Sequence, residues 1–396
     1  MYSLSAILRD IVWVIVFIQK LSGERNKGMA SQQTAQGEYF FLPQEHILFG
    51  TGSIANLADE VARLGVKRVL IITGRSLATQ TDVIAQVEQA LGSTYHTIFA
   101  GIRQHTPRSD VAQATALLLQ EQIDGLISVG GGSPIDAAKA VSMRFLQEYN
   151  RVLPHIAIPT TLSAAEFSHL VGVTDEQANI KAGFAHTLVT PRSVILDASL
   201  TLPTPMQLWL SSGIRALDHA VETLYAPGLH PINDTLALEA IRKLFTYLPR
   251  CQSRPDDLAT RTELQIAAWM SFFGEVNTPL GLSHNLGRRI GASYNVPHGI
   301  TSCITLAPVM RAFSSIHTHA LAQIAQALHL VDEGDYSQSA ALKAADAVSE
   351  LVRHLGLPQR LRDVNVPESD LHVIATSTPS RELNAAQVEE LLQAIW

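Results

Sequence analysis

Two arginine–histidine pairs and a further histidine in the second half of the chain have the types and spacing to do chemistry. Arg215 and His219 are four residues apart, and so are His284 and Arg288, so each pair shares one face of a predicted helix. His298 lies at a predicted turn just after the second pair. Imidazoles bind metals and transfer protons, while guanidinium groups bind carboxylate and carbonyl oxygens. A single histidine is more often structural, but three histidines flanked by two arginines predict a metal or substrate site.

A run of three glycines in the first half of the chain predicts a second kind of site, one made of backbone. The run follows an apolar stretch that predicts a buried strand, and it consists of Gly130, Gly131 and Gly132. Ser133 is expected to cap the helix that follows, with Pro134 at its first position and Asp136 in its first turn. Free N–H groups and the helix dipole at such a helix start favour an anion. A tight connection that binds nothing is the alternative, but three glycines before a capped helix favour phosphate binding.

Alternating strand and helix patterns are expected to position this glycine run. Apolar runs predict strands over residues 66–73, 95–100, 126–129, 156–159 and 193–197. Helical patterns between them cover residues 53–64 and 109–122, with another helix ending near residue 91. A short hairpin is expected over residues 40–43 and 46–50, and a hairpin turn at residues 174–177. The alternation predicts a parallel sheet covered on both faces.

In open sheets of this kind the ligand lies beyond the carboxyl ends of the strands. Besides the glycine run and Ser133, the residues expected there are Gly74, Thr106, Thr160 and Thr161. The strand that ends at residue 73 is not followed by an acidic residue that would bind an adenosine ribose, and Arg75 could instead meet a 2′-phosphate. NADP is therefore supported at least as well as NAD, although an exposed turn arginine is an equally good interpretation of Arg75.

Beyond residue 203, long helical patterns replace the alternation. They cover residues 211–225, 232–248, 258–273, 282–294, 300–313, 320–328, 339–355 and 385–396. We therefore expect an α/β dinucleotide-binding domain over residues 29–198 and an all-helical domain over residues 199–396. Residues 1–28 are expected to be an N-terminal extension, either disordered or not native to the mature protein. Their apolar run over residues 11–18 is too short to span a membrane.

The overall composition excludes several classes of protein. Hydrophobic residues make up 46% and charged residues 16% of the 396-residue chain, which excludes a disordered protein. The formal net charge is −7 and no basic run is present, so no nucleic-acid partner is expected. Cys251 and Cys303 lie far apart, as in proteins of a reducing cytoplasm. We expect a cytoplasmic protein that binds a small molecule and no membrane.

Taken together, these residues resemble the group III iron-containing alcohol dehydrogenase family over roughly residues 45–310. The glycine run matches the pyrophosphate loop of that family, and residues 159–166 are similar to its loop at the ribose and nicotinamide. The segments 105–107 and 222–227 resemble most closely the maleylacetate reductase branch. The resemblance implies a Rossmann-like α/β domain followed by a helical domain, as in dehydroquinate synthase, an NAD(P) cofactor and a homodimer. It also implies that Lys181 meets the nicotinamide ribose.

The chain departs from this family where a metal would bind. Metal-dependent members use one aspartate and three histidines, and the histidines match His219, His284 and His298, but Arg215 stands at the position of the aspartate. A permanent cation there would repel a divalent ion, so we expect no metal, with iron or zinc on the three histidines if one is present. Arg288 replaces a further family histidine near the substrate.

We therefore expect an oxidoreductase that uses NADPH or NADH to reduce an activated C=C or C=O bond of a small anionic or carbonyl-bearing substrate. The two arginines would hold or polarise this substrate in place of a metal, and His219 or His298 would donate the proton. One alternative is a metal-dependent alcohol dehydrogenase that tolerates Arg215. Another is a lyase, dehydratase or cyclase of a biosynthetic pathway on the same fold. A structural salt bridge with Asp218 or Glu222 is the alternative role for Arg215.

Overall fold

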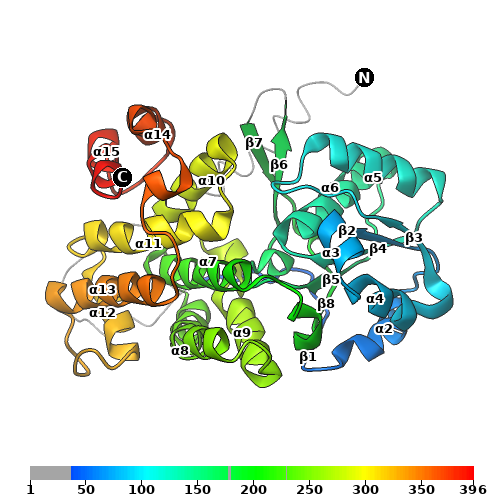
Figure 1. Cartoon of the computed structure of the whole chain (residues 1–396), viewed down its shortest axis with the longest axis horizontal. Helices are drawn as coiled ribbons and strands as arrows, with labels where there is room; N and C mark the ends of the chain where they lie inside the picture. Colours follow the sequence, from blue (N-terminus) through cyan, green and yellow to red (C-terminus); the bar gives the residue numbers. More distant parts are fainter. Residues whose placement is uncertain (1–36, 177–179, 229) are drawn as a thin grey trace.

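The computed structural model describes residues 37–176, 180–228 and 230–396, so the expectation for residues 1–28 lies outside the described residues. The chain folds first into an α/β unit and then into an all-helical unit, which lie side by side (Figure 1). This order confirms the predicted architecture. The predicted domain boundary near residue 198 falls on a short 3₁₀ helix, Ala198–Thr201, between the last strand of the sheet and the first long helix.

A six-stranded parallel sheet is the centre of the α/β unit. Its strand order is β1-β8-β5-β4-β2-β3. The strands are β1 (His46–Phe49), β2 (Val69–Thr73), β3 (Tyr95–Phe99), β4 (Gly125–Gly130), β5 (His155–Pro159) and β8 (Ser193–Leu196). The central strands are buried along their whole length, as expected of a parallel sheet covered on both faces. The carboxyl ends of β2, β4 and β5 therefore meet at one edge of the sheet.

Helices cover the two faces of this sheet and form two separate apolar cores. They are α2 (Leu57–Arg63), α3 (Arg75–Gln80), α4 (Val83–Leu91), α5 (Arg108–Gln120) and α6 (Gly132–Tyr149). The core on one face includes residues of α2 and α4, and the core on the other includes residues of α5 and α6. The segment predicted to be one helix ending near residue 91 is two helices, because Thr81 takes an extended conformation between them.

The hairpin predicted over residues 40–43 and 46–50 is wrong. Only residues 46–49 form a strand, and this strand pairs in parallel with β8. The preceding segment instead lies against the helical unit, where the backbone of Phe40 exchanges hydrogen bonds with the Asn277 side chain at 2.8 and 2.9 Å. The residues predicted to form a hairpin thus contact two distant parts of the chain, which are β8 and the segment that contains Asn277.

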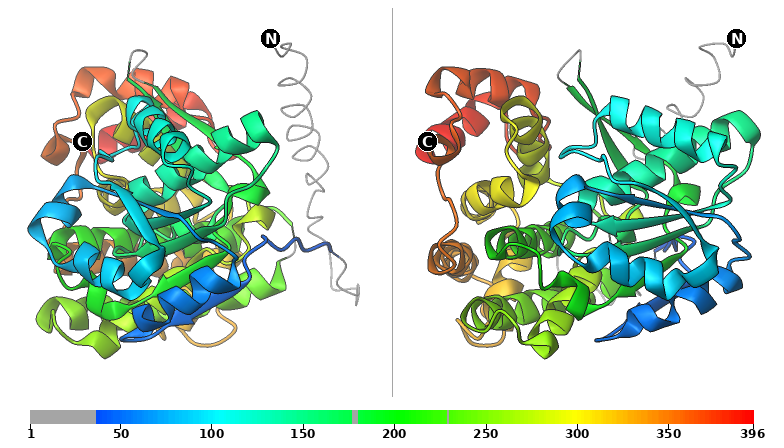
Figure 2. Two further views of the ribbon diagram at one scale, coloured as in Figure 1. Left: turned by 90° about the vertical axis from the view of Figure 1, so that its right-hand side faces the viewer. Right: turned by 45° about the vertical axis from the view of Figure 1, so that its right-hand side comes forward.

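A second hairpin, near the turn predicted at residues 174–177, is present. Its strands are β6 (Leu170–Asp175) and β7 (Ile180–Ala185), which pair in antiparallel fashion, and residues 177–179 between them lie outside the described residues. The hairpin lies between α6 and the helical unit in Figure 1 and in the right-hand view of Figure 2. It is therefore placed to form a wall between the two units.

The helical unit is built around the long helix α7 (Met206–Tyr225), which is buried along most of its length. The other helices are α8 (Pro231–Ser253), α9 (Leu258–Ser271), α10 (Leu282–Tyr294), α11 (His298–Phe313), α12 (Thr318–Ala327), α13 (Gln338–His354), α14 (Leu371–Ser377) and α15 (Ala385–Ala394). Short 3₁₀ helices lie at Ser53–Asn56, Gly92–Thr94, Ala165–Phe167, Thr187–Val189, Glu275–Asn277, Leu361–Val364 and Glu368–Asp370. The helix predicted to begin at residue 211 begins five residues earlier, and α14 was not predicted.

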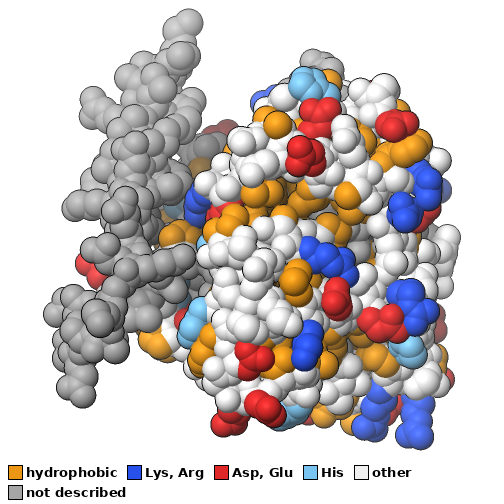
Figure 3. Space-filling view, turned by 90° about the vertical axis from the view of Figure 1, so that its left-hand side faces the viewer, with side chains coloured by type: hydrophobic (Ala, Val, Ile, Leu, Met, Phe, Trp, Pro, Cys, Tyr) orange, Lys and Arg blue, Asp and Glu red, His pale blue; other side chains and the backbone are white. Residues whose placement is uncertain are grey.

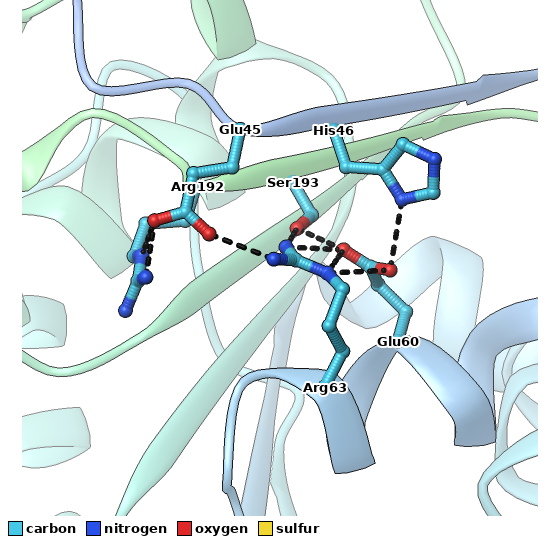
Figure 4. A network of polar contacts seen from close by, with 6 residues as sticks. All are labelled: Glu45, His46, Glu60, Arg63, Arg192 and Ser193. Atoms are coloured by element: carbon cyan, nitrogen blue, oxygen red, sulfur yellow. Dashed lines mark hydrogen bonds and ion pairs between the residues drawn. The ribbon is translucent and has the colours of Figure 1, made fainter.

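A polar network fastens the edge strand β1 to the rest of the sheet (Figure 4). Buried Glu60 on α2 accepts hydrogen bonds from Arg63 and Ser193 and lies 3.0 Å from the His46 ring. Burial alone would raise the pKa of Glu60, but these partners outweigh it and lower that pKa to about 2. Glu60 therefore acts as an ionised anchor for the strand.

The surface of the helical unit carries charges of both signs. In Figure 3, acidic and basic side chains are interspersed over the face in view, with apolar side chains between them. No helix among the described residues is both long and apolar enough to cross a bilayer.

Candidate active site

One cavity of about 1260 Å³ runs between the α/β unit and the helical unit. Its walls bring together most of the predicted site residues: Gly74, Gly130, Gly131, Gly132, Ser133, Asp136, Thr160, Thr161, Arg215, His219, His284, Arg288 and His298. Arg75 and Thr106 are not among the lining residues, and Lys181 lies on β7, the strand that contributes Gly183 to the wall. The glycine run and the arginine–histidine cluster, separated by about a hundred residues of sequence, therefore face one space.

The glycine run forms the sharp turn from β4 into α6. Gly130 has a φ of 136°, a conformation that other residues rarely adopt. A Cβ at Gly131 would lie 3.2 Å from the Thr161 side chain, so glycine permits this close approach of two loops. No side chain caps the first turn of α6, whose free N–H groups suit an anion such as a phosphate.

The prediction that Ser133 caps this helix is wrong, because the helix begins one residue before it and Gly131 is the N-cap. Ser133 instead accepts a hydrogen bond from the backbone N–H of His105 at 3.1 Å. The Thr106 hydroxyl donates to the Ser133 carbonyl at 3.2 Å. Thr106 is thus a buried support of the loop rather than part of the cavity wall.

Asp136 lies in the second turn of α6, not in the first as predicted. One of its oxygens accepts a hydrogen bond from the Gly172 N–H at 3.2 Å, and the other lies 3.4 Å from the buried Lys139 ammonium. Lys139 in turn donates to the Leu170 carbonyl at 2.9 Å. These contacts fasten the β6–β7 hairpin to α6 at the edge of the cavity.

The cavity wall at the end of β2 is polar but not acidic. Gly74 is the N-cap of α3, and Ser76, Gln80 and Thr81 line the wall with it. None of the described lining residues at this end has a carboxylate that would bind a ribose hydroxyl. Arg75, the first residue of α3, is exposed.

Arg215 lies in a buried polar cluster of the helical unit. Its guanidinium donates to the Ser302 hydroxyl at 3.1 Å and lies 3.4 Å from an Asp218 carboxylate oxygen. That oxygen also accepts from Ser302 at 2.6 Å and from Ser283 at 3.0 Å. Burial lowers the pKa of Arg215 and raises that of Asp218. The Arg215–Asp218 salt bridge, which is the alternative role for Arg215, is present, and Arg215 also lines the cavity.

Glu222 stands behind His284 in the same cluster. Its carboxylate accepts from the backbone N–H groups of Gly281 at 2.6 Å and His284 at 3.2 Å, and it lies 2.8 Å from Nδ1 of the His284 ring. Burial raises the pKa of Glu222 to about 7 and lowers the pKa of His284 to about 3. Asp218 and Glu222 were not predicted as site residues. Their spacing could have indicated them as site residues, because residues 215, 218 and 222 share one face of α7.

His219 is held between two rings. It stacks on Phe272 at a centroid distance of 3.8 Å and on His284 at 4.7 Å. Burial lowers its pKa well below the ordinary value, so the ring is neutral at neutral pH. His298 lies at another part of the wall. Its ring meets the His105 ring edge to face, with a distance of 5.3 Å between the ring centroids.

Arg288 differs from Arg215 in its surroundings. It is exposed to the cavity, and no carboxylate, carbonyl or hydroxyl in the described parts of the chain pairs with it. Its guanidinium lies against β7, where a Cβ at Gly183 would lie only 2.7 Å from it. A side chain at that position would therefore displace the end of this flexible arginine.

These residues do not fit the metal site of the resembling family. Among the described residues, the group whose ligand atoms all lie within 4.8 Å of one another is Asp218, Glu222 and His284, not the three histidines. The two carboxylates of that group are already engaged by hydrogen-bond donors, and the Arg215 cation lies beside Asp218. A permanent cation at that point opposes a divalent ion.

Comparison with known proteins agrees with the resemblance. The chain matches the family models for iron-containing alcohol dehydrogenase over residues 43–198 and for the C-terminal part of Fe-containing alcohol dehydrogenases over residues 209–395. It is 31% identical over 325 residues to a maleylacetate reductase of Pseudomonas sp. (strain P51), with 82% of this chain and 86% of the relative covered. It is 28% identical to an NAD-dependent methanol dehydrogenase of Bacillus methanolicus, with 85% and 92% covered.

The fold is shared with solved structures of the same family. The crystal structure of maleylacetate reductase from Agrobacterium tumefaciens superimposes with a TM-score of 0.79 at 27% identity, covering 92% of this chain and 99% of that one. With the two family models spanning most of the sequence, the chain belongs to the iron-containing alcohol dehydrogenase family of oxidoreductases, near its maleylacetate reductase branch.

Proposed function

We propose that this chain is an NAD(P)H-dependent reductase that acts without a bound metal on an activated C=C or C=O bond of a small anionic substrate. The observation that carries the proposal is the position of Arg215. This guanidinium lines the cavity at the place where metal-dependent relatives keep an aspartate, and it is held there by Asp218 and Ser302. A guanidinium supplies hydrogen bonds and positive charge, which are the contributions that a metal would make to a developing oxyanion.

The cofactor would lie along the glycine run. The N-terminus of α6 would bind its pyrophosphate, and Thr160 and Thr161 would lie toward the ribose and nicotinamide, where the resemblance also implies Lys181. When bound, the reduced dinucleotide supplies the hydride. Because no carboxylate lines the described wall after β2, we expect NADPH to be accepted at least as well as NADH.

The helical unit would bind and protonate the substrate. Arg288 would hold its anionic group, and Arg215 would polarise the carbonyl that activates the reacting bond. His219 or His298 would donate the proton, since both imidazoles line the cavity. His219, which burial keeps neutral, would act through its own ring N–H. His284, fixed by Glu222, would complete the polar wall.

The test is an assay of NADPH oxidation, followed by absorbance, against unsaturated acids, oxo acids, ketones and aldehydes, with maleylacetate included. The protein is treated with a chelator and its metal content is measured first. We expect oxidation of NADPH with an unsaturated or oxo acid by metal-free protein. Activity that returns only with added iron or zinc would contradict the metal-free mechanism.

A metal-dependent alcohol dehydrogenase is the second candidate, and one observation favours it. Asp218, Glu222 and His284 offer two carboxylates and an imidazole whose ligand atoms all lie within 4.8 Å of one another. If this group held the metal, Asp218→Asn and Glu222→Gln would each remove bound metal and alcohol oxidation together.

We also expect a homodimer in the cytoplasm, as the resemblance implies. Cys251 and Cys303 are both buried and unpaired, which suits a reducing compartment. Light scattering of the purified protein tests the oligomeric state.

A further inference from the structure

The charges around the cavity limit the kind of anion that can bind. Three arginines line it: Arg103, Arg215 and Arg288. Arg103 is paired with Asp110 at 2.6 Å and with Glu176 at 2.8 Å, and the charge of Arg215 is offset by Asp218 at 3.4 Å. Among the described residues of the wall, only the Arg288 cation has no carboxylate beside it. Within the described wall, one positive charge is therefore left for a ligand, and the side chain of Lys181, which the resemblance assigns to the nicotinamide ribose, lies outside the described residues.

The hairpin wall near this cation is largely apolar, with His186 as a polar member. Leu170 and Ala185 pair across the β6–β7 hairpin, two residues from the Gly172–Gly183 pair, so they share the hairpin face on which Arg288 lies. All four of these hairpin residues line the cavity. A ligand held by Arg288 thus has apolar side chains on the hairpin side.

The helical side of the cavity combines apolar side chains with histidines, serines and Arg215. Phe272 stacks on His219 and lines the cavity together with Leu280. The nearest carboxylates there, Asp218 and Glu222, are buried and engaged by donors. A second carboxylate on the ligand would meet apolar surface, the His219 and His284 rings, which burial keeps neutral, or Arg215, whose charge Asp218 offsets. Among the described lining residues it would find no second unpaired cation to repay its desolvation.

We propose that the substrate is a monocarboxylate with an apolar body, an oxo or unsaturated acid whose single carboxylate is bound by Arg288, and not a dicarboxylate. This inference rests on the proposed function and specifies its substrate class. Arg288 determines the specificity for the acid, and a side chain at position 183 would displace its guanidinium.

Equilibrium binding of unreactive probes tests the proposal without turnover. The protein with NADP⁺ is titrated by calorimetry with 3-phenylpropanoate, with its amide, 3-phenylpropanamide, and with glutarate. We expect 3-phenylpropanoate to bind at least about tenfold more tightly than the amide, because the amide loses a charge-assisted hydrogen bond. It should also bind at least about tenfold more tightly than glutarate, whose second carboxylate must be desolvated.

Variants separate Arg288 from a general loss of binding. Arg288→Gln should bring the acid and the amide to within about threefold of each other, since the preference depends on one charge-assisted contact. Gly183→Ala should lower the preference partly. Arg289→Gln removes the neighbouring arginine of the same helix, which does not line the cavity, and should leave the preference unchanged. An unchanged affinity for NADP⁺ shows that each variant is folded.

Three results would overturn the proposal: glutarate binding as tightly as 3-phenylpropanoate, no binding of 3-phenylpropanoate, or a preference for the acid that survives Arg288→Gln. Failure of the proposed reductase activity is a different result, because it is read from NADPH absorbance and not from these titrations.

Discussion

The two walls of the cavity are built in different ways. The α/β wall presents backbone: a glycine turn, the uncapped start of α6 and loop hydroxyls. The helical wall presents polar side chains from α7 and α10, namely the largely buried Arg215, the neutral ring of His284 and the exposed Arg288, supported by hydroxyls from α10 and α11. A backbone site depends on local conformation, whereas a side-chain site depends on which helices pack together. We therefore expect substitutions in the helical wall, such as an exchange of Arg215, to change the chemistry more readily than substitutions in the backbone wall.

The largest expected effect is on the side-chain wall. Arg215→Leu should lower kcat by roughly 10²–10³-fold, because it removes the donor that we expect to polarise the substrate. It should also destabilise the fold by about 3–5 kcal/mol, because Asp218 would be buried without its cation. Steady-state kinetics and urea unfolding measure the two effects. Arg289→Leu is the matched control, and an equal loss of kcat in that variant would contradict the assigned role.

Two buried glutamates sharpen the comparison, because the pKa of Glu60 in the α/β unit is lowered to about 2 while that of Glu222 in the helical unit is raised to about 7. A carboxyl whose pKa falls on folding stabilises the fold above its ordinary pKa near 4.5, and this contribution disappears as the pH falls toward 2.

Glu60→Gln should therefore lower the free energy of unfolding by roughly 3 kcal/mol at pH 7 and by nearly nothing near pH 2. Denaturant unfolding at several pH values measures the difference. The kcat of the folded variant should not change, because Glu60 lies at the sheet edge away from the cavity. A difference that is the same at every pH would show that ionisation of Glu60 is not responsible.

On the backbone wall, Gly130→Ala should weaken NADPH binding by roughly 10–100-fold, equivalent to about 1–3 kcal/mol of backbone strain. The φ of 136° is unfavourable for alanine, and its Cβ would lie 3.1 Å from Pro134. Fluorescence titration of NADPH measures the affinity. Gly334→Ala has a positive φ of 86° with open space around it, so it controls for strain alone. If both variants lost the same NADPH affinity, the glycine turn would not be the cofactor site that we propose.

The smallest effect is expected at Arg75. Because this exposed residue does not line the cavity, Arg75→Ala should change the ratio of kcat/KM for NADPH and NADH by less than about threefold, the size of a weak surface charge effect. Kinetics with both cofactors measure the ratio. A large loss that is selective for NADPH would restore Arg75 as the 2′-phosphate ligand.

The backbone wall was largely predictable from sequence. Three glycines between an apolar run and a helical pattern leave few alternative conformations, and the strands that end beside them are continuous apolar runs. The error at Ser133 is a local one, since serine favours an N-cap but here supports the loop that contains His105. The preference of serine for the N-cap position does not distinguish a helix cap from a support of the neighbouring loop.

The side-chain wall was predictable only in part. The four-residue spacings placed Arg215 with His219 and His284 with Arg288, but the partners of each side chain come from other helices. Asp218 and Glu222 looked like ordinary helix residues because their burial depends on α10 and α11. The separation of His298 from the other two histidines likewise depends on tertiary packing.

The central claim is that the Arg215 guanidinium takes the place of a catalytic metal. The most direct test is elemental analysis of the purified protein, expressed with iron and zinc supplied, together with NADPH oxidation before and after chelation. The account predicts metal far below one ion per chain and activity that chelation does not change. One tightly bound transition metal per chain, with activity lost on its removal, would contradict it.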